Sequence, residues 1–176
     1  MMEVRHCWTL ALLAIALVTA GCDSVAQYSG DGKLIDNGSR AATDRYVLDL
    51  GTISLKKPVT ETFKLKNLPK ENFVVGLELR GPAGSKLEQS AITPVVSIAL
   101  LEDGKPIITK DAKLGEWTWS VRSPGDSAFV YGREKPGTYF DALHGKSYEL
   151  IFQVKEPDRG GTNYTASLVA KTGGWK

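Results

Sequence analysis

The chain has 176 residues, which suits one domain with short additions, and its 42% hydrophobic and 24% charged residues are typical of a globular protein. A formal net charge of +2 without a basic run gives no electrostatic footprint for nucleic acid, so we expect no nucleic-acid partner. The 18 glycines and 8 prolines supply the turns that many short strands need.

Residues 1–21 have the pattern of a secretion signal. Arg5 makes the start weakly basic, and the stretch from Trp8 to Ala20 carries no charge. A helix of that length spans about 20 Å, whereas a hydrocarbon core is about 30 Å thick, so this stretch is too short to cross a bilayer comfortably. A basic start, a brief apolar run and small residues at its end predict a signal peptide. The alternative is a buried N-terminal helix of the mature fold.

The signal ends in Thr19-Ala20-Gly21-Cys22, which resembles the bacterial lipobox, with Thr19 where leucine is usual. The resemblance implies cleavage before Cys22, a diacylglycerol on its thiol and a fatty acid such as palmitate on the new amine. Several acyl chains anchor a protein stably, whereas one gives marginal membrane binding. Because Cys7 lies in the signal, the mature chain would have no second cysteine for a disulfide. The expected location is therefore the bacterial cell envelope.

The residues after the lipobox bear on which membrane holds the protein and on how far the domain lies from it. In enteric lipoproteins an aspartate after the lipidated cysteine favours retention in the inner membrane, so Asp23 is a candidate sorting signal for the periplasmic side of that membrane, ahead of the outer membrane. Residues 22–43 are polar and lack periodicity, which predicts a lipidated cysteine followed by a flexible tether. A coil of this length extends roughly 25 Å. We therefore assign residues 44–176 to the folded domain.

The remainder of the chain alternates apolar and polar residues with a period of two, which is typical of half-buried strands. Strands are predicted over residues 46–50, 59–65, 73–79, 95–101, 117–121, 148–154 and 164–170. Asp103-Gly104 marks a tight hairpin turn. The fold class is therefore all-β: a single immunoglobulin-like or jelly-roll β-sandwich of about 7–9 mostly antiparallel strands.

The segment at 143–154, LHGKSYELIFQV, resembles the turn and strand entry of bacterial immunoglobulin-like domains. Together with the lipobox, the whole chain is similar to small proteobacterial β-sandwich lipoproteins that are uncharacterised. These resemblances imply a fold and an anchor but no activity.

Catalytic and metal-binding motifs are not found. His144 is the single histidine outside the signal and adjoins a glycine turn, so we expect a solvated loop residue. No nucleophile elbow, P-loop, zinc set or EF-hand spacing occurs, so we predict no cofactor and no metal site. A carboxylate pair remains an alternative, with candidates Asp49, Glu61, Glu78 and Glu149. Glu61 stands on an otherwise apolar face, which indicates a rim position.

Aromatic residues are the candidate contact residues. Trp117 and Trp119 share one strand face, which either fills the core or forms an open stacking platform. Tyr131 and Tyr139 lie in a long stretch, residues 122–143, that we expect to be an irregular loop and a contact surface. The leading hypothesis is thus a non-catalytic, lipid-anchored envelope protein that binds another macromolecule, either an envelope complex or a toxin. A carbohydrate- or peptidoglycan-binding module and a carboxylate-based hydrolase are the alternatives.

Overall fold

A computed structural model describes residues 27–38, 43–122, 124–161 and 163–173. The predicted signal, Cys22, Asp23 and the terminal Trp175 lie outside these residues. None of the helices in the described part is long and apolar enough to cross a membrane.

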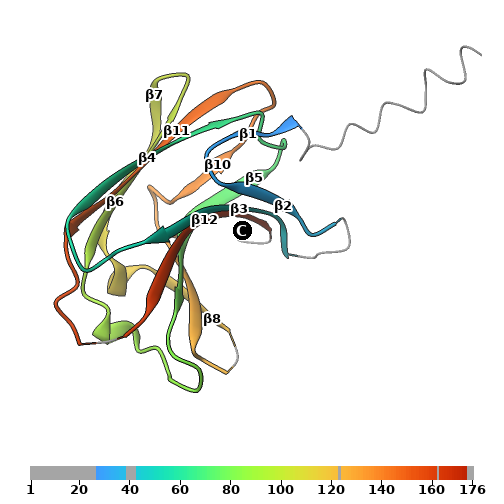
Figure 1. Ribbon diagram of the computed structural model, residues 1–176. Helices are drawn as coiled ribbons and strands as arrows, with labels where there is room; N and C mark the ends of the chain where they lie inside the picture. The colour runs from blue at the N-terminus through green and yellow to red at the C-terminus, as the bar shows by residue number, and fades with distance from the viewer. Residues whose placement is uncertain (1–26, 39–42, 123, 162, 174–176) are drawn as a thin grey trace, which may run out of the picture.

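Two antiparallel sheets pack as a β-sandwich, which confirms the predicted fold class (Figure 1). The five-stranded sheet has the order β1-β4-β11-β6-β7; the seven-stranded sheet has the order β2-β3-β12-β5-β9-β8, and β10 also pairs with β5. In the described part of the chain the strands are β1 (Ser29–Gly30), β2 (Lys33–Asp36), β3 (Thr43–Ile53), β4 (Val59–Lys66), β5 (Asn72–Arg80), β6 (Val95–Glu102), β7 (Lys105–Lys113), β8 (Thr118–Arg122), β9 (Ser127–Tyr131), β10 (Tyr139–Asp141), β11 (Ser147–Glu156) and β12 (Thr165–Gly173).

The core lies between the sheets and is built from the alternating apolar positions of both. Leu48, Leu77 and Leu168 face it from the seven-stranded sheet, and Ile98 and Phe152 from the five-stranded sheet, all at 0% exposure. Each such side chain contributes about 1.5–3 kcal/mol through burial. All seven predicted segments overlap observed strands, because in most of them one face is buried and the other is not.

The predicted tether contains the first two strands. Residues 29–36 form β1 beside β4 and β2 beside β3, so the chain passes from one sheet to the other at Asp31-Gly32. Asp31 N–H donates to Lys64 O (2.9 Å), and Asp31 Oδ2 accepts from Lys64 N–H (2.7 Å). Leu34 is 6% exposed and joins the core. The ordered part of the domain therefore begins before residue 44, because one buried leucine and backbone pairing suffice for short edge strands.

The expected loop at 122–143 was a wrong prediction, since it contains β9 and β10. Every residue of β9 is buried, with Ala128 and Val130 in the core and Phe129 and Tyr131 on the opposite face. Burial on both faces removes the alternation by which strands are recognised. The hairpin at Asp103-Gly104 is confirmed: φ is +47° and +81° at these residues, and they join β6 to β7.

Asp158 fastens one end of the sandwich. Its carboxylate accepts hydrogen bonds from Thr93 Oγ1 (2.7 Å), the Tyr164 hydroxyl (2.7 Å) and Gly160 N–H (3.1 Å), while its N–H donates to Leu55 O (2.8 Å). Burial acts to raise the pKa of Asp158, but these hydrogen bonds together outweigh it and the net shift is downward. Burial and the same carboxylate raise the pKa of Tyr164. The loop between β11 and β12 is thus tied to the rest of the domain.

Candidate functional site

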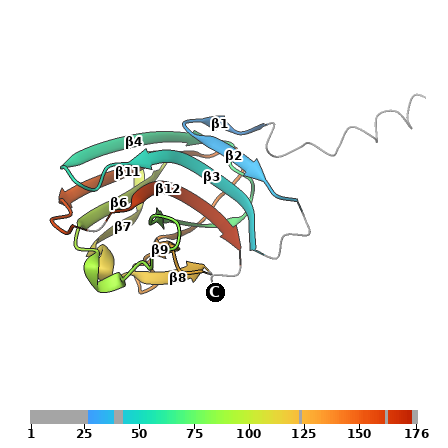
Figure 2. The same ribbon diagram turned by 60° about the horizontal axis from the view of Figure 1, so that its bottom comes forward.

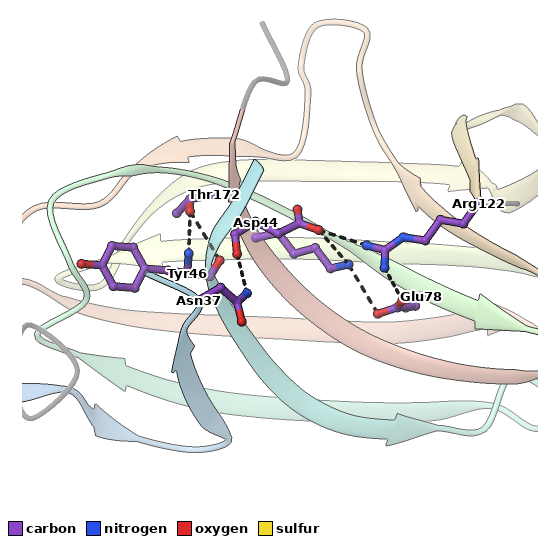
Figure 3. Close-up of polar contacts among 7 residues, drawn as sticks. Asn37, Asp44, Tyr46, Glu78, Arg122 and Thr172 are labelled. Carbon is purple, nitrogen blue, oxygen red and sulfur yellow. Dashed lines mark hydrogen bonds and ion pairs between the residues drawn. The ribbon is translucent and has the colours of Figure 1, made fainter. Parts of the chain in front are cut away.

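The outer face of the seven-stranded sheet, which points away from the core, carries a charged network. It consists of Asp44 at the start of β3, Glu78 on β5, Arg122 at the end of β8 and Lys171 on β12, and we call these four residues the outer-face network (Figure 3). The register of the sheet brings them together, because β12 lies between β3 and β5. Four strands distant in sequence therefore meet in one set of ion pairs.

Lys171 is the buried member of this network, with a side chain only 3% exposed. Its Nζ lies 3.4 Å from Glu78 Oε2, 3.8 Å from Asp44 Oδ2 and 4.8 Å from the centroid of the Phe129 ring. An unpaired buried ammonium is very costly, so two carboxylates and an aromatic face are the surroundings it requires. The network therefore neutralises a charge that this face cannot expose to water.

Arg122 is the exposed member, with 51% of its side chain accessible. Its Nη2 donates to Asp44 Oδ2 at 3.0 Å, and its Nη1 lies 3.8 Å from Glu78 Oε1. Both carboxylates, which are 20% and 24% exposed, are thus shared between a buried and an exposed cation. The guanidinium is held in one place and still presents donors to solvent.

The backbone at Asp44 is shaped for this role. Its φ of +57° is left-handed, a conformation that aspartate tolerates better than most residues. Asn37 Nδ2 donates to Asp44 O (2.6 Å), which holds the entry to β3 against the end of β2. Among the described residues, no donor reaches the buried Asp44 Oδ1. This oxygen retains capacity for a further hydrogen bond.

A second apolar cluster lies on the same face. Phe129 and Tyr131 stack at 5.3 Å, and Tyr139 meets Tyr131 edge-on at 6.0 Å. The ring of Phe129 covers Gly76: a Cβ there would lie 2.8 Å from Phe129 Cε2 and 2.4 Å from Val130 O. Burial and the nearby Tyr131 raise the pKa of Tyr139. The cluster gives this sheet apolar packing on both faces.

A depression of about 340 Å³ adjoins the network on the outer face. Glu78 belongs to both, and the other lining residues are Ile35, Val47, Asp49, Arg80, Thr165, Ser167 and Val169. Ile35 is 37% exposed, and Asp49 and Arg80 are exposed as well. Apolar side chains thus lie beside charges of both signs, as they do at the polar rim of a protein–protein interface. The arrangement suits binding of a polar macromolecular surface.

The tryptophans nominated from the sequence belong to the core. Trp117 is 4% exposed, and the half-buried Trp119 packs against the same core and donates from Nε1 to Leu114 O (3.1 Å). Of the two open interpretations, core filling is therefore the one observed, and the indoles form no open platform. Tyr131 is buried and Tyr139 half-buried in the outer-face cluster rather than on a loop.

Most of the remaining sequence candidates are dispersed, although Asp49 and Glu78 both line the depression. His144 is exposed in the turn before β11, as expected, and Glu61 is exposed on β4 near the margin of its sheet, as the rim interpretation predicted. Glu78 alone among the candidate carboxylates joins the network. Within the described ranges, no group of three or more histidine, cysteine or acidic residues could hold a metal ion. Lys171, Asp44 and Arg122 were not predicted from the sequence, since nothing near them in the sequence marks them as partners.

No protein-family model matches the chain, and no curated protein matches it either.

Proposed function

We propose that this protein is a lipid-anchored bacterial envelope protein whose β-sandwich binds another macromolecule, without catalysis, through the outer face of its seven-stranded sheet. The lipobox-like Thr19–Cys22 supports the anchor, and Asp23 supports placement in the inner membrane facing the periplasm, ahead of the outer membrane. The partner is a protein of an envelope complex, or a toxin if the chain is an immunity protein.

The observation that carries this proposal is Arg122, half-exposed yet fixed by two carboxylates beside a depression of about 340 Å³. Arginine is enriched at binding hot spots, because its planar guanidinium can donate several hydrogen bonds at once. A side chain that is already ordered loses less conformational entropy when a partner binds. The network thus holds Arg122 in an ordered, accessible position, while Lys171 stays buried.

The two alternative functions lack a comparable site. A glycan-binding surface built on Trp117 and Trp119 requires open indoles, whereas Trp117 is 4% exposed. A hydrolase requires two carboxylates with different environments facing one cleft. Asp49 and Glu78 line the same depression, but Asp49 is exposed and Glu78 is paired with Arg122 and Lys171, so neither is the desolvated carboxyl that a general acid needs. We therefore propose neither alternative.

Site-specific photo-crosslinking in living cells tests the binding face. A photoreactive residue at Thr165, which is exposed and lines the depression, is compared with one at Gln153, which is exposed on the five-stranded sheet. We expect a discrete adduct from position 165 that Arg122→Ala weakens and that position 153 does not give. Equal adducts from both positions, or indifference to Arg122→Ala, would contradict the proposed face.

A further inference from the structure

We propose that the open edge of β4, Val59–Phe63, binds an extended strand of a partner protein and so adds a sixth strand to the five-stranded sheet. The inference rests on the proposed function only in that the protein binds a partner, because this edge is separate from the outer-face network. The partner strand carries a basic residue opposite Glu61 and acidic residues near its ends.

The edge is open because β1 covers only one end of β4. β1 pairs with Leu65 and Lys66, and Asp31 satisfies both backbone groups of Lys64, so the coverage stops there (Figure 2). Backbone groups alternate sides along a strand, so the N–H and C=O of Thr62 and Thr60 point outward as those of Lys64 do. Within the described chain, β4 has β11 as partner along its other side and no strand beside Thr60 and Thr62.

This edge carries fewer of the devices that prevent edge pairing than the opposite margin of the sheet does. β7, at the opposite margin of the sheet, has Lys105, Pro106, Lys110 and Lys113, and the β6–β7 register shifts between Leu100 and Leu101. Lysines, prolines and bulges discourage another chain from pairing.

The open edge of β4, in contrast, contains no proline, lysine, glycine or register shift, and its one guarding charge is Glu61, on the face that Val59 and Phe63 share. Its valine, threonines and phenylalanine favour extended structure. Thr60, Glu61 and Thr62 are all exposed. The segment is therefore competent to pair as it stands.

Charge identifies the occupant as a different chain rather than a second copy. Antiparallel pairing of two copies through Thr60 and Thr62 would place Glu61 directly opposite the other Glu61, and like charges opposite one another destabilise a sheet. A shifted register would need backbone hydrogen bonds from Lys64 or from Pro58. The backbone of Lys64 is already bound by Asp31, and Pro58 has no N–H. A partner strand with lysine or arginine opposite Glu61 avoids this repulsion. The exposed Lys57 and Lys64 favour acidic residues at its ends.

Residue-resolved amide exchange by NMR tests the inference on the full chain in detergent micelles. The probe is a seven-residue valine–threonine peptide with a central lysine and terminal glutamates; the control peptide has a central glutamate and terminal lysines. In the free protein, the Thr60 and Thr62 amides should exchange rapidly, while those of Glu61 and Phe63, which face β11, are protected. The lysine-centred peptide should slow exchange at Thr60 and Thr62 and bind at least about threefold more tightly than the control.

Three variants sharpen the result. Thr62→Pro removes an outward N–H and should abolish protection by the peptide while the Glu61 and Phe63 amides stay protected, because proline is tolerated on the open side of an edge strand. Thr62→Val keeps the N–H and should bind as the wild type does. Glu61→Lys should reduce the preference for the lysine-centred peptide, because the central pair becomes repulsive while Lys57 and Lys64 still attract its terminal glutamates.

Four outcomes would overturn the inference: no protection by either peptide, equal protection by both, binding that survives Thr62→Pro, or concentration-dependent protection without peptide, which would identify a second copy as the occupant. Crosslinking from position 165 is unaffected by any of them, so the proposed binding face can stand while this inference fails, or fail while it stands.

Discussion

Replacing Lys171 by methionine tests whether the outer-face network stabilises a buried charge. Methionine matches the length of the lysine stem, so the change removes the ammonium and keeps most of the apolar packing against Phe129. Removing one partner of a fully buried ion pair costs about 3–5 kcal/mol. Asp44 and Glu78 are 20% and 24% exposed and retain Arg122, so we expect a smaller loss of about 1–2 kcal/mol in the free energy of unfolding.

Chemical denaturation with three companion variants makes this prediction sharp. Lys171→Ala also deletes the buried stem and should cost about 2–4 kcal/mol. Lys155→Met is the matched control, because its ammonium pairs with Asp111 while 41% exposed, and should cost less than about 1 kcal/mol. A double-mutant cycle of Lys171→Met with Glu78→Gln should show a coupling of about 0.5–2 kcal/mol.

The dependence on salt concentration distinguishes the buried Lys171 from the exposed Arg122. The buried Lys171 pairs are poorly screened, so the cost of Lys171→Met should persist near 1 M salt, where the Debye length is about 3 Å. A Lys171→Met protein as stable as the wild type, with additive double mutants, would refute the reasoning that the carboxylates compensate a buried ammonium.

Three further predictions concern the fold and the anchor. Asp158→Asn should cost about 1–3 kcal/mol in thermal or chemical unfolding, because the amide cannot accept all the hydrogen bonds, including that from Tyr164. Since the folded-state pKa of Asp158 is below its ordinary value of 3.8, its contribution should be complete above that pH and disappear as the pH falls through the folded pKa; an unchanged gap between wild type and variant in strong acid would contradict this. Gly76→Ala should lower the free energy of unfolding by about 1–3 kcal/mol, as its Cβ would meet Phe129, and an unchanged melting temperature would refute that. Cys22→Ala should move the protein from the membrane to the soluble fraction and prevent incorporation of labelled palmitate; unchanged partitioning would argue against lipidation.

Strands with one buried face could be predicted from the sequence. Residues 148–154 alternate because Leu150 and Phe152 face the core while Glu149 and Gln153 do not. β9 could not, because both of its faces are covered, and β7 could not, because Ile108 is its one buried residue in the structure. The alternation of apolar and polar residues reveals a strand when one of its faces is buried. It gives little information when both faces are buried or both are exposed.

The outer-face network depends on register rather than on local pattern. Asp44 and Lys171 are neighbours because β12 pairs with β3, and Glu78 joins them because β5 pairs with the other side of β12. Sequence spacing does not determine such pairings between distant strands. Lys171 lies between Ala170 and Thr172 and resembles any lysine on an exposed strand face. Conversely, the closeness of Trp117 and Trp119 was visible in the sequence, but their packing against the core was not, and β8 begins only at Thr118.

The most direct test of the central claim, that the outer face binds a macromolecular partner, is the affinity of the partner crosslinked at position 165 for purified variants, measured by calorimetry. Arg122→Ala should weaken binding by more than about fivefold, as expected for an arginine hot spot, with little change in melting temperature because the guanidinium is half exposed. Lys155→Ala, which removes a paired cation from the other sheet, should leave the affinity unchanged. Equal affinity of the wild type and Arg122→Ala for that partner would contradict the account.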